Sequence, residues 1–293
     1  MKSLKPHQIG IVLAASGSLL VSLDSLGFRL TEEDPWNNAF WLGVFIAMAM
    51  LVLVPIRTGR SFPAVARSEG RIVLISGGLQ GATTGLFVLA IDATAVSNVV
   101  AIVAATPMFA AVVAHYAIKE KTSTRTWLAI VVALAGVLVI VSGSLGGGNI
   151  TGDLYAVAAI TGFSFNLTLW RRFPALNRQV VIGLGGLFLA LVAFVPADPL
   201  DVSANAIIIL AVLGILTGPA GRVFIATSTR YLTAAEVGLF TPVETIAATT
   251  WAWLFLSEVP TQTTIIGGLI VIIAVTFGVA GTRGQRPVPA PPI

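Results

Sequence analysis

Residues 241–258 read TPVETIAATTWAWLFLSE, a largely apolar run that opens with Thr-Pro and closes with Ser-Glu. Its length is close to the roughly 20 residues that an α-helix needs to cross a bilayer. Pro242 removes one helical hydrogen bond and frees a carbonyl group. Glu244 follows two residues later, and a central charge costs about 2.5–3.5 kcal/mol in a membrane. The stretch therefore predicts a membrane helix that combines a break with a buried acid.

The pattern occurs a second time, earlier in the chain. Residues 94–107 read TAVSNVVAIVAATP and residues 229–242 read TRYLTAAEVGLFTP. Each segment ends in Thr-Pro and is followed by an apolar run, a Glu (Glu120 or Glu258), a short Thr-rich loop and a last apolar stretch. The repetition indicates two copies of one structural unit.

The composition places this unit in a lipid environment. The chain has 293 residues, of which 56% are hydrophobic and only 10% are charged, whereas a soluble domain carries about 25% charged residues. Apolar runs of sufficient length predict ten spans: residues 9–30, 36–56, 71–91, 94–117, 125–142, 153–171, 179–196, 204–229, 233–256 and 262–281. The fold class is therefore an all-α membrane protein with ten transmembrane helices.

The positions of Lys and Arg give the spans a direction. With the N-terminus in the cytoplasm, fifteen of the seventeen Lys and Arg residues fall on the inner side, as the positive-inside rule requires. The exceptions are Arg29, which lies outside, and Arg222, which lies within a span. The same rule accounts for the net charge of +4, so nucleic-acid binding is not needed to explain it. We expect a multi-pass protein of the bacterial inner membrane with both termini in the cytoplasm.

Five spans in each half are an odd number, so the two copies must lie in opposite orientations. We expect residues 1–148 to form the first repeat and residues 149–282 the second, inverted repeat. Residues 283–293 form a Pro-rich tail that we expect to be cytoplasmic and disordered. Inverted repeats are typical of transporters, whose sites lie near the midplane where broken helices meet.

Two five-helix halves with Pro and then Glu before the final helix of each half resemble the drug/metabolite transporter superfamily. The ten-helix EamA-type exporters are the subgroup with the most similar pattern. Residues 241–258 carry the strongest match, and residues 106–120, TPMFAAVVAHYAIKE, carry a weaker one. The resemblance implies export of small metabolites by alternating access. Amino acids are the expected substrates, with aromatic or other hydrophobic ones favoured, and the aromatic amino acid exporters are one member type.

Polar residues within the spans are the candidate site residues. Glu244 could contact a substrate amine or bind a proton, or could be a protonated acid bonded to a neighbouring helix. Arg222 could bind a substrate carboxylate, pair with Glu236 or Glu244, or extend to the inner interface. Asp24 could attract a cation or form an outer gate, or could be a solvated neighbour of Arg29.

Glu236 belongs to Thr233-Ala-Ala-Glu236, a capping box that favours a structural role.

The third span holds Gln80 and Thr84 near its middle, among Gly77, Gly81 and Gly85. Closely spaced glycines favour helix packing, whereas the Gln80 amide requires a partner. Gly77-x3-Gly81 matches Gly214-x3-Gly218 in the eighth span, where Thr217 precedes Gly218 and Pro219. We expect hinges at Pro107, Pro242, Gly218 and Pro219, and a matching Gly-rich break in the third span. Phe163, on the sixth span, could line an aromatic-binding cavity or pack against neighbouring helices.

Several function classes lack support in the sequence. There is no Gly-x4-Gly-Lys-Ser/Thr phosphate loop, and no His-Glu-x-x-His motif occurs in a chain with two His and no Cys. We therefore expect no catalytic residues, no cofactor, no metal and no enzyme activity, with a small molecule and the lipid bilayer as partners and a functional monomer. Export of drugs, nucleobases or vitamins is the alternative within transport. A passive channel or a lipid-modifying membrane enzyme is the alternative outside it.

Overall fold

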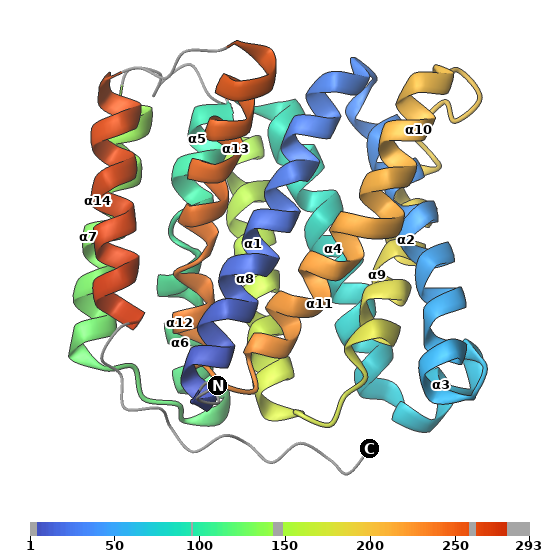
Figure 1. Ribbon diagram of the computed structural model, residues 1–293, viewed down its shortest axis with the longest axis horizontal. Coiled ribbons are helices and arrows are strands. Elements are labelled where there is room, and N and C mark those ends of the chain that lie inside the picture. The colour runs from blue at the N-terminus through green and yellow to red at the C-terminus, as the bar shows by residue number, and fades with distance from the viewer. Residues whose placement is uncertain (1–4, 95, 143–148, 258–261, 280–293) are drawn as a thin grey trace.

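The structure, a computed structural model, describes residues 5–94, 96–142, 149–257 and 262–279. All of the regular structure in these residues is helical (Figure 1). In chain order the elements are α1 (Pro6–Thr31), α2 (Pro35–Thr58), α3 (Phe62–Glu69), α4 (Arg71–Ala93), α5 (Val96–Val103), α6 (Thr106–Ile118), α7 (Thr124–Val141), α8 (Ile150–Arg172), α9 (Arg178–Ala193), α10 (Ala204–Val212), the π-helix η1 (Leu213–Thr217), α11 (Gly218–Ser228), α12 (Ala234–Gly238), α13 (Thr241–Leu256) and α14 (Gln262–Val279).

The helices run up and down and confirm the ten spans, of which seven are single helices and three are composite. The composite spans are α5–α6, α10–η1–α11 and α12–α13. The N-terminus and α3 lie at the same end of the bundle (Figure 1), and we call this the N-terminal end. The short helix α3 was not predicted, because its eight residues follow a charged loop and are too few for a span.

The Thr-Pro breaks lie where the sequence predicts them. α5 ends at Val103 and α6 begins at Thr106, while α12 ends at Gly238 and α13 begins at Thr241. In both cases the proline occupies the first turn of the new helix, where the missing N–H needs no partner.

The two remaining predicted breaks have different outcomes. In the eighth span the chain stays helical: the π-helix η1 ends at Thr217, and α11 begins with Gly218 and Pro219. The predicted break in the third span is wrong, because α4 is continuous from Arg71 to Ala93. Its glycines serve helix packing instead: a β-carbon on Gly81 would lie 2.7 Å from the carbonyl oxygen of Gly185.

The pairs of packed helices show the inverted symmetry. α2 packs on α9 and α7 packs on α14, so each pair joins equivalent spans of the two halves. α1 packs on α11, and its equivalent, α8, packs on α4. The fourth spans of the two halves also end alike: α6 is followed by Lys119 (φ 57°) and α13 by Ser257 (φ 58°), and each of these residues directly precedes a Glu in the sequence.

Glycine is required where the equivalent spans cross. A β-carbon on Gly43 of α2 would lie 2.7 Å from the carbonyl oxygen of Gly186 on α9, and one on Gly186 would lie 2.8 Å from that of Gly43. Gly136 of α7 and Gly267 of α14 oppose each other's carbonyl oxygens in the same reciprocal way. These are backbone contacts, so a larger residue could be accommodated only by moving a helix.

The predicted register between the third and eighth spans is shifted. Gly81 lies against Gly185 and Phe188 of α9, and Gly214 lies against Leu42 and Phe45 of α2. When Gly43 of α2 is matched with Gly186 of α9, both pairs of contact residues lie one position before and two positions after the matched glycine, so the contacts are equivalent. Gly81 therefore corresponds to Gly214, one helical turn from the sequence match of Gly77 with Gly214.

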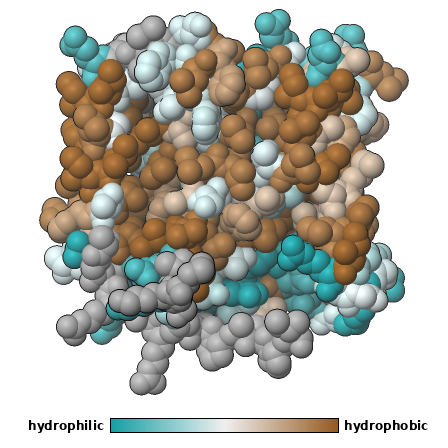
Figure 2. Space-filling model, viewed as in Figure 1, coloured by the Kyte–Doolittle hydropathy of each residue, from teal (hydrophilic) through white to brown (hydrophobic). Residues whose placement is uncertain are grey.

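The surface agrees with a membrane environment. Figure 2 shows a hydrophobic band around the middle of the visible face, with hydrophilic side chains gathered at the two ends. Val52 of α2, Val131 of α7 and Ile273 of α14 are apolar residues that are each at least 60% exposed. Among the described residues, six helical stretches are long and apolar enough to cross a bilayer, and Thr124–Ile140 and Arg178–Ala193 are shorter apolar helices.

Some predictions concern residues outside the described part of the chain. These are the Glu258 that follows the second Thr-Pro segment and the cytoplasmic tail 283–293. The repeat boundaries at residues 148 and 149 also stay a prediction.

Replacing Gly43 by Ala should destabilise the protein, because its β-carbon would meet backbone atoms of α9 that a rotamer change cannot move. Overpacking typically costs about 1–3 kcal/mol, which thermal unfolding in detergent will detect as a lower midpoint. Gly78→Ala is the matched control, since nothing lies within 4 Å of its added β-carbon. Equal midpoints for the two variants would contradict the close α2–α9 approach.

Candidate functional site

Asp24 and Arg222 form an ion pair in the interior of the bundle. α1 supplies Asp24 and α11 supplies Arg222, and the two helices approach closely where Gly17 and Gly221 oppose each other's carbonyl oxygens. Arg222 donates from Nη2 to Oδ2 of Asp24 over 2.9 Å. Arg222 is therefore paired, but its partner is Asp24 and not Glu236 or Glu244 as the sequence predicts. Asp24 is likewise a buried partner of Arg222 instead of a solvated neighbour of Arg29.

The ion pair does not use all of its hydrogen-bonding capacity. Oδ1 of Asp24 and Nη1 of Arg222 are buried without a hydrogen-bond partner, and so is the hydroxyl of Thr217. Buried polar atoms are normally satisfied, and leaving one unsatisfied costs about 1–3 kcal/mol. The site therefore holds a free acceptor and a free donor, which is the chemistry that binds a polar ligand.

Glu244 adds a second carboxylate to the site. It lies in the first turn of α13, directly after the Thr241-Pro242 break, where the helix N-terminus favours a negative charge. Both Asp24 and Arg222 interact with it electrostatically. Glu244, on α13, therefore lies within electrostatic range of the Asp24–Arg222 pair that joins α1 and α11.

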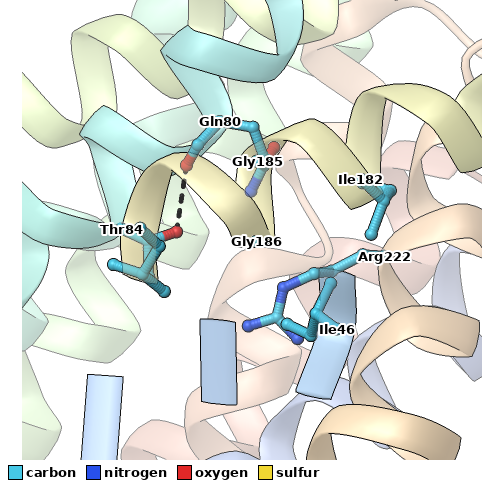
Figure 3. Close-up of a pocket in the computed structure, with 8 residues that line it drawn as sticks. Ile46, Gln80, Thr84, Ile182, Gly185, Gly186 and Arg222 are labelled. Carbon is cyan, nitrogen blue, oxygen red and sulfur yellow. Dashed lines mark hydrogen bonds between the residues drawn. The ribbon is translucent and has the colours of Figure 1, made fainter. Parts of the chain in front are cut away.

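A small cavity opens on the other side of Arg222. Its lining comprises Ile46, Gln80, Thr84, Ile182, Gly185, Gly186, Leu189 and Arg222, and Figure 3 shows seven of these by label. The volume is about 10 Å³, close to the minimum for one water molecule. Pockets that hold small ligands measure about 300–1,000 Å³, so this conformation is nearly closed around the site.

The side-chain amide of Gln80 is hydrogen-bonded to Asn166, as expected for an amide near the middle of a membrane span. Asn166 of α8 donates from Nδ2 to Oε1 of Gln80 over 3.1 Å. Asn166 is itself held by Ser76 of α4, whose hydroxyl also accepts a hydrogen bond from the indole of Trp170. The α4–α8 interface thus carries a neutral polar network, whereas the equivalent α1–α11 interface carries the ion pair.

A second buried ion pair, between Glu120 and Arg171, lies at the N-terminal end of the bundle. Nε of Arg171, at the end of α8, lies 2.8 Å from Oε2 of Glu120, and both side chains are 7% exposed. The other oxygen of Glu120 accepts from the backbone N–H of Ala234 over 3.0 Å, and Nη1 of Arg171 donates to the carbonyl of Thr229 over 3.1 Å. The pair thus ties the first half to the segment between α11 and α13.

The predicted site residues fall into two groups that share Arg222. Asp24, Glu244 and Arg222 form the charged group, while Gln80, Thr84 and Arg222 line the cavity. Phe163 lies outside both groups and packs edge-on against Trp170, with 6.4 Å between the ring centroids. Glu236 has the predicted capping role, because its carboxylate accepts the backbone N–H and the hydroxyl of Thr233.

Sequence reasoning did not identify Glu120 with Arg171, or Ser76, as partners in buried networks. Glu120 and Arg171 lie at span ends, where a charged residue ordinarily marks only the membrane boundary. The signal available for Glu120 was its place after the Thr-Pro segment in the repeat. Ser76 carried no such signal, since its contacts lie about 90 residues away along the chain.

The chain was compared with known proteins. A model of the EamA-like transporter family matches residues 8–142 and 150–279. The "Uncharacterized transporter YdfC" of Bacillus subtilis (strain 168) is 25% identical over 186 residues, which are 60% of this chain and 60% of that protein. The chain thus matches about three fifths of the length of this curated relative.

A solved crystal structure of a protein also shares the fold, with a TM-score of 0.76 and 16% sequence identity. The match covers 92% of this chain and 96% of the other. At this identity the likeness supports the architecture alone.

Replacing one member of the Asp24–Arg222 pair should destabilise the protein more than replacing both. Asp24→Asn or Arg222→Gln leaves a buried charge without its partner, which typically costs about 3–5 kcal/mol. The double variant should lose less than the sum of the two single losses. Denaturant unfolding in detergent measures these changes, with exposed Arg57→Gln as the control. Additive losses would show that the two side chains do not interact.

Proposed function

Because the chain belongs to the EamA-like transporter family, and is therefore a multi-pass membrane transporter, we propose that it exports amino acids. The observation that carries this proposal is the charged group of Asp24, Arg222 and Glu244. An amino acid brings one carboxylate and one ammonium group. The guanidinium of Arg222 complements the first, and the carboxylates of Asp24 and Glu244 complement the second.

Hydrophobic and aromatic amino acids are the favoured substrates. Ile46, Ile182 and Leu189 give the cavity beside Arg222 an apolar wall, which suits an apolar side chain. Polar amino acids would leave their own side chains without partners at this wall, at a cost of about 1–3 kcal/mol for each unsatisfied group.

Alternating access is the proposed mechanism. The Glu120–Arg171 pair closes the N-terminal end of the bundle, and the closed cavity must widen to admit a substrate. Pro107, Pro242 and the Gly218-Pro219 pair are the proposed hinges, because the helical hydrogen bonding is already interrupted or displaced there. Breaking the Glu120–Arg171 pair would open the site toward the N-terminal end.

The charge distribution supports an orientation with both termini in the cytoplasm of a bacterial cell, so the N-terminal end would face the cytoplasm. Opening at that end would load the substrate, and opening at the other end would release it. The proposed functional unit is a monomer, since the charged group and the cavity draw on helices of a single chain.

Export of cationic amphipathic compounds is a second candidate. It is favoured by the excess of acids at the site, where Asp24 and Glu244 face the single cation Arg222. A substrate with an ammonium group and no carboxylate would bind to these two acids and would not need Arg222.

Uptake into proteoliposomes tests the proposal. Vesicles that contain the purified protein should accumulate labelled phenylalanine, leucine or tryptophan in a saturable way, and unlabelled amino acids should compete. Arg222→Gln should lower the rate at least about tenfold, as expected for loss of a charge-assisted hydrogen bond. Saturable movement of cationic dyes without amino-acid flux would favour the second candidate, and movement of neither would reject both.

Replacing Glu244 by Gln should flatten the pH dependence of transport if this residue binds the coupling proton. The ionisable groups that interact with it are Asp24 and Arg222. Of the helices packed on α13, α1 also carries His7 and Arg29 towards its two ends, and the sequences of α5 and α14 contain no ionisable residue. Initial rates measured across a pH series will show the effect, with Glu32→Gln on the exposed surface as the control. An unchanged profile would assign proton coupling to another group.

A further inference from the structure

A chain of buried hydrogen bonds runs from Trp170 to the cavity and fixes the direction of each donor along it. The indole N–H of Trp170 can only donate, and it donates to Oγ of Ser76 over 2.9 Å. The Ser76 hydroxyl then donates its own hydrogen to Oδ1 of Asn166 over 2.6 Å. Ser76 and Asn166 are 0% exposed and Trp170 is 1% exposed, so bulk water does not reach the network.

The order of donors continues from Asn166 to Gln80. Because Oδ1 of Asn166 accepts from the Ser76 hydroxyl, its amide nitrogen is directed away from that hydroxyl. That nitrogen donates to the backbone carbonyl of Ser76 over 3.2 Å and to Oε1 of Gln80 over 3.1 Å. The side-chain oxygen of Gln80 is thereby committed to Asn166, and its NH₂ group is the part that is left for the cavity.

The cavity therefore presents donors from two directions. Figure 3 shows the amide nitrogen of Gln80 directed toward the side of the cavity on which Arg222 lies. Arg222 also lines the cavity, and its guanidinium has donor capacity left, because Nη1, which lies beside Gly218, has no hydrogen-bond partner. Thr84 adds no donor, because its hydroxyl donates to the backbone carbonyl of Gln80 over 3.0 Å. An NH₂ group and a guanidinium that converge on one space suit an anionic, planar acceptor.

We propose that Gln80 and Arg222 form a carboxylate subsite, and that Ser76, Asn166 and Trp170 act as positioning residues that keep the Gln80 amide nitrogen turned into the cavity. The proposal rests on the proposed function and deepens it. The site would select compounds with a carboxylate over the corresponding amines, while Asp24 and Glu244 receive the ammonium group of an amino acid.

Two isosteric variants reverse the donor chemistry without changing the volume. Gln80→Glu replaces the NH₂ group with an oxygen that repels a carboxylate. Asn166→Asp accepts a hydrogen bond from the Gln80 NH₂ group, so the amide turns its oxygen to the cavity. Gln80→Met removes the donor and keeps the length. Thr161→Val is the control on α8, because the Thr161 hydroxyl bonds only within its own helix, to the carbonyl of Val157 over 2.7 Å.

The experiment measures the affinity of the purified, detergent-solubilised full chain for two probes by ligand-dependent thermal stabilisation. The probes are 3-phenylpropanoate, which has only the carboxylate, and phenethylamine, which has only the amine. The wild type and Thr161→Val should bind 3-phenylpropanoate. Gln80→Glu, Gln80→Met and Asn166→Asp should each bind it about tenfold or more weakly, with phenethylamine binding changed less than threefold.

Equal affinity of the wild type and Gln80→Glu for 3-phenylpropanoate would overturn the subsite, as would the absence of any carboxylate binding by the wild type. Parallel loss of both probes in Asn166→Asp and Gln80→Met would show a structural role and also overturn it. Failure of the proposed function is seen separately, as the absence of amino-acid flux in proteoliposomes of the wild type.

Discussion

The structure depends on one constraint: the hydrocarbon core of a bilayer offers no hydrogen-bond partner for a backbone or a charge. Every interrupted helix and every buried ionisable side chain must therefore find its partners inside the protein. At the breaks before Pro107 and Pro242 the backbone keeps hydrogen bonds across the interruption, from the N–H of Ala105 to the carbonyl of Ile102 over 3.0 Å and from the N–H of Phe240 to the carbonyl of Val237 over 3.1 Å. Asp24 and Arg222 meet it by pairing with each other.

The two halves share one backbone architecture in opposite orientations, but the polar side chains at the equivalent helix interfaces differ. The α1–α11 interface carries a charged pair, whereas the equivalent α8–α4 interface carries the neutral network of Ser76, Asn166 and Gln80. Arg222 connects the two, since it pairs with Asp24 and lines the cavity with Gln80. The symmetry thus supplies helix breaks and close crossings, and the departures from symmetry supply the candidate site.

Much of the fold was predictable, because membrane crossing imposes length and charge rules on each segment separately. The spans followed from apolar length, and the breaks at Pro107 and Pro242 followed from the missing backbone donor. The partner of Arg222 could not be found in this way, because Asp24 lies 198 residues away along the chain. The register of Gly81 with Gly214 was missed for a related reason: glycines spaced by four residues fit equally well when the match is shifted by one turn.

Side-specific labelling of a single cysteine tests the central claim, that the cavity beside Arg222 is reached alternately from the two membrane faces. The chain contains no Cys, so Thr84→Cys gives one reactive position in the cavity lining. Glu120→Gln weakens the closure at the N-terminal end. We predict that it raises labelling by a membrane-impermeant maleimide from the face of the N-terminal end and lowers labelling from the opposite face. Labelling that rises on both faces, or that Glu120→Gln leaves unchanged, would contradict the account.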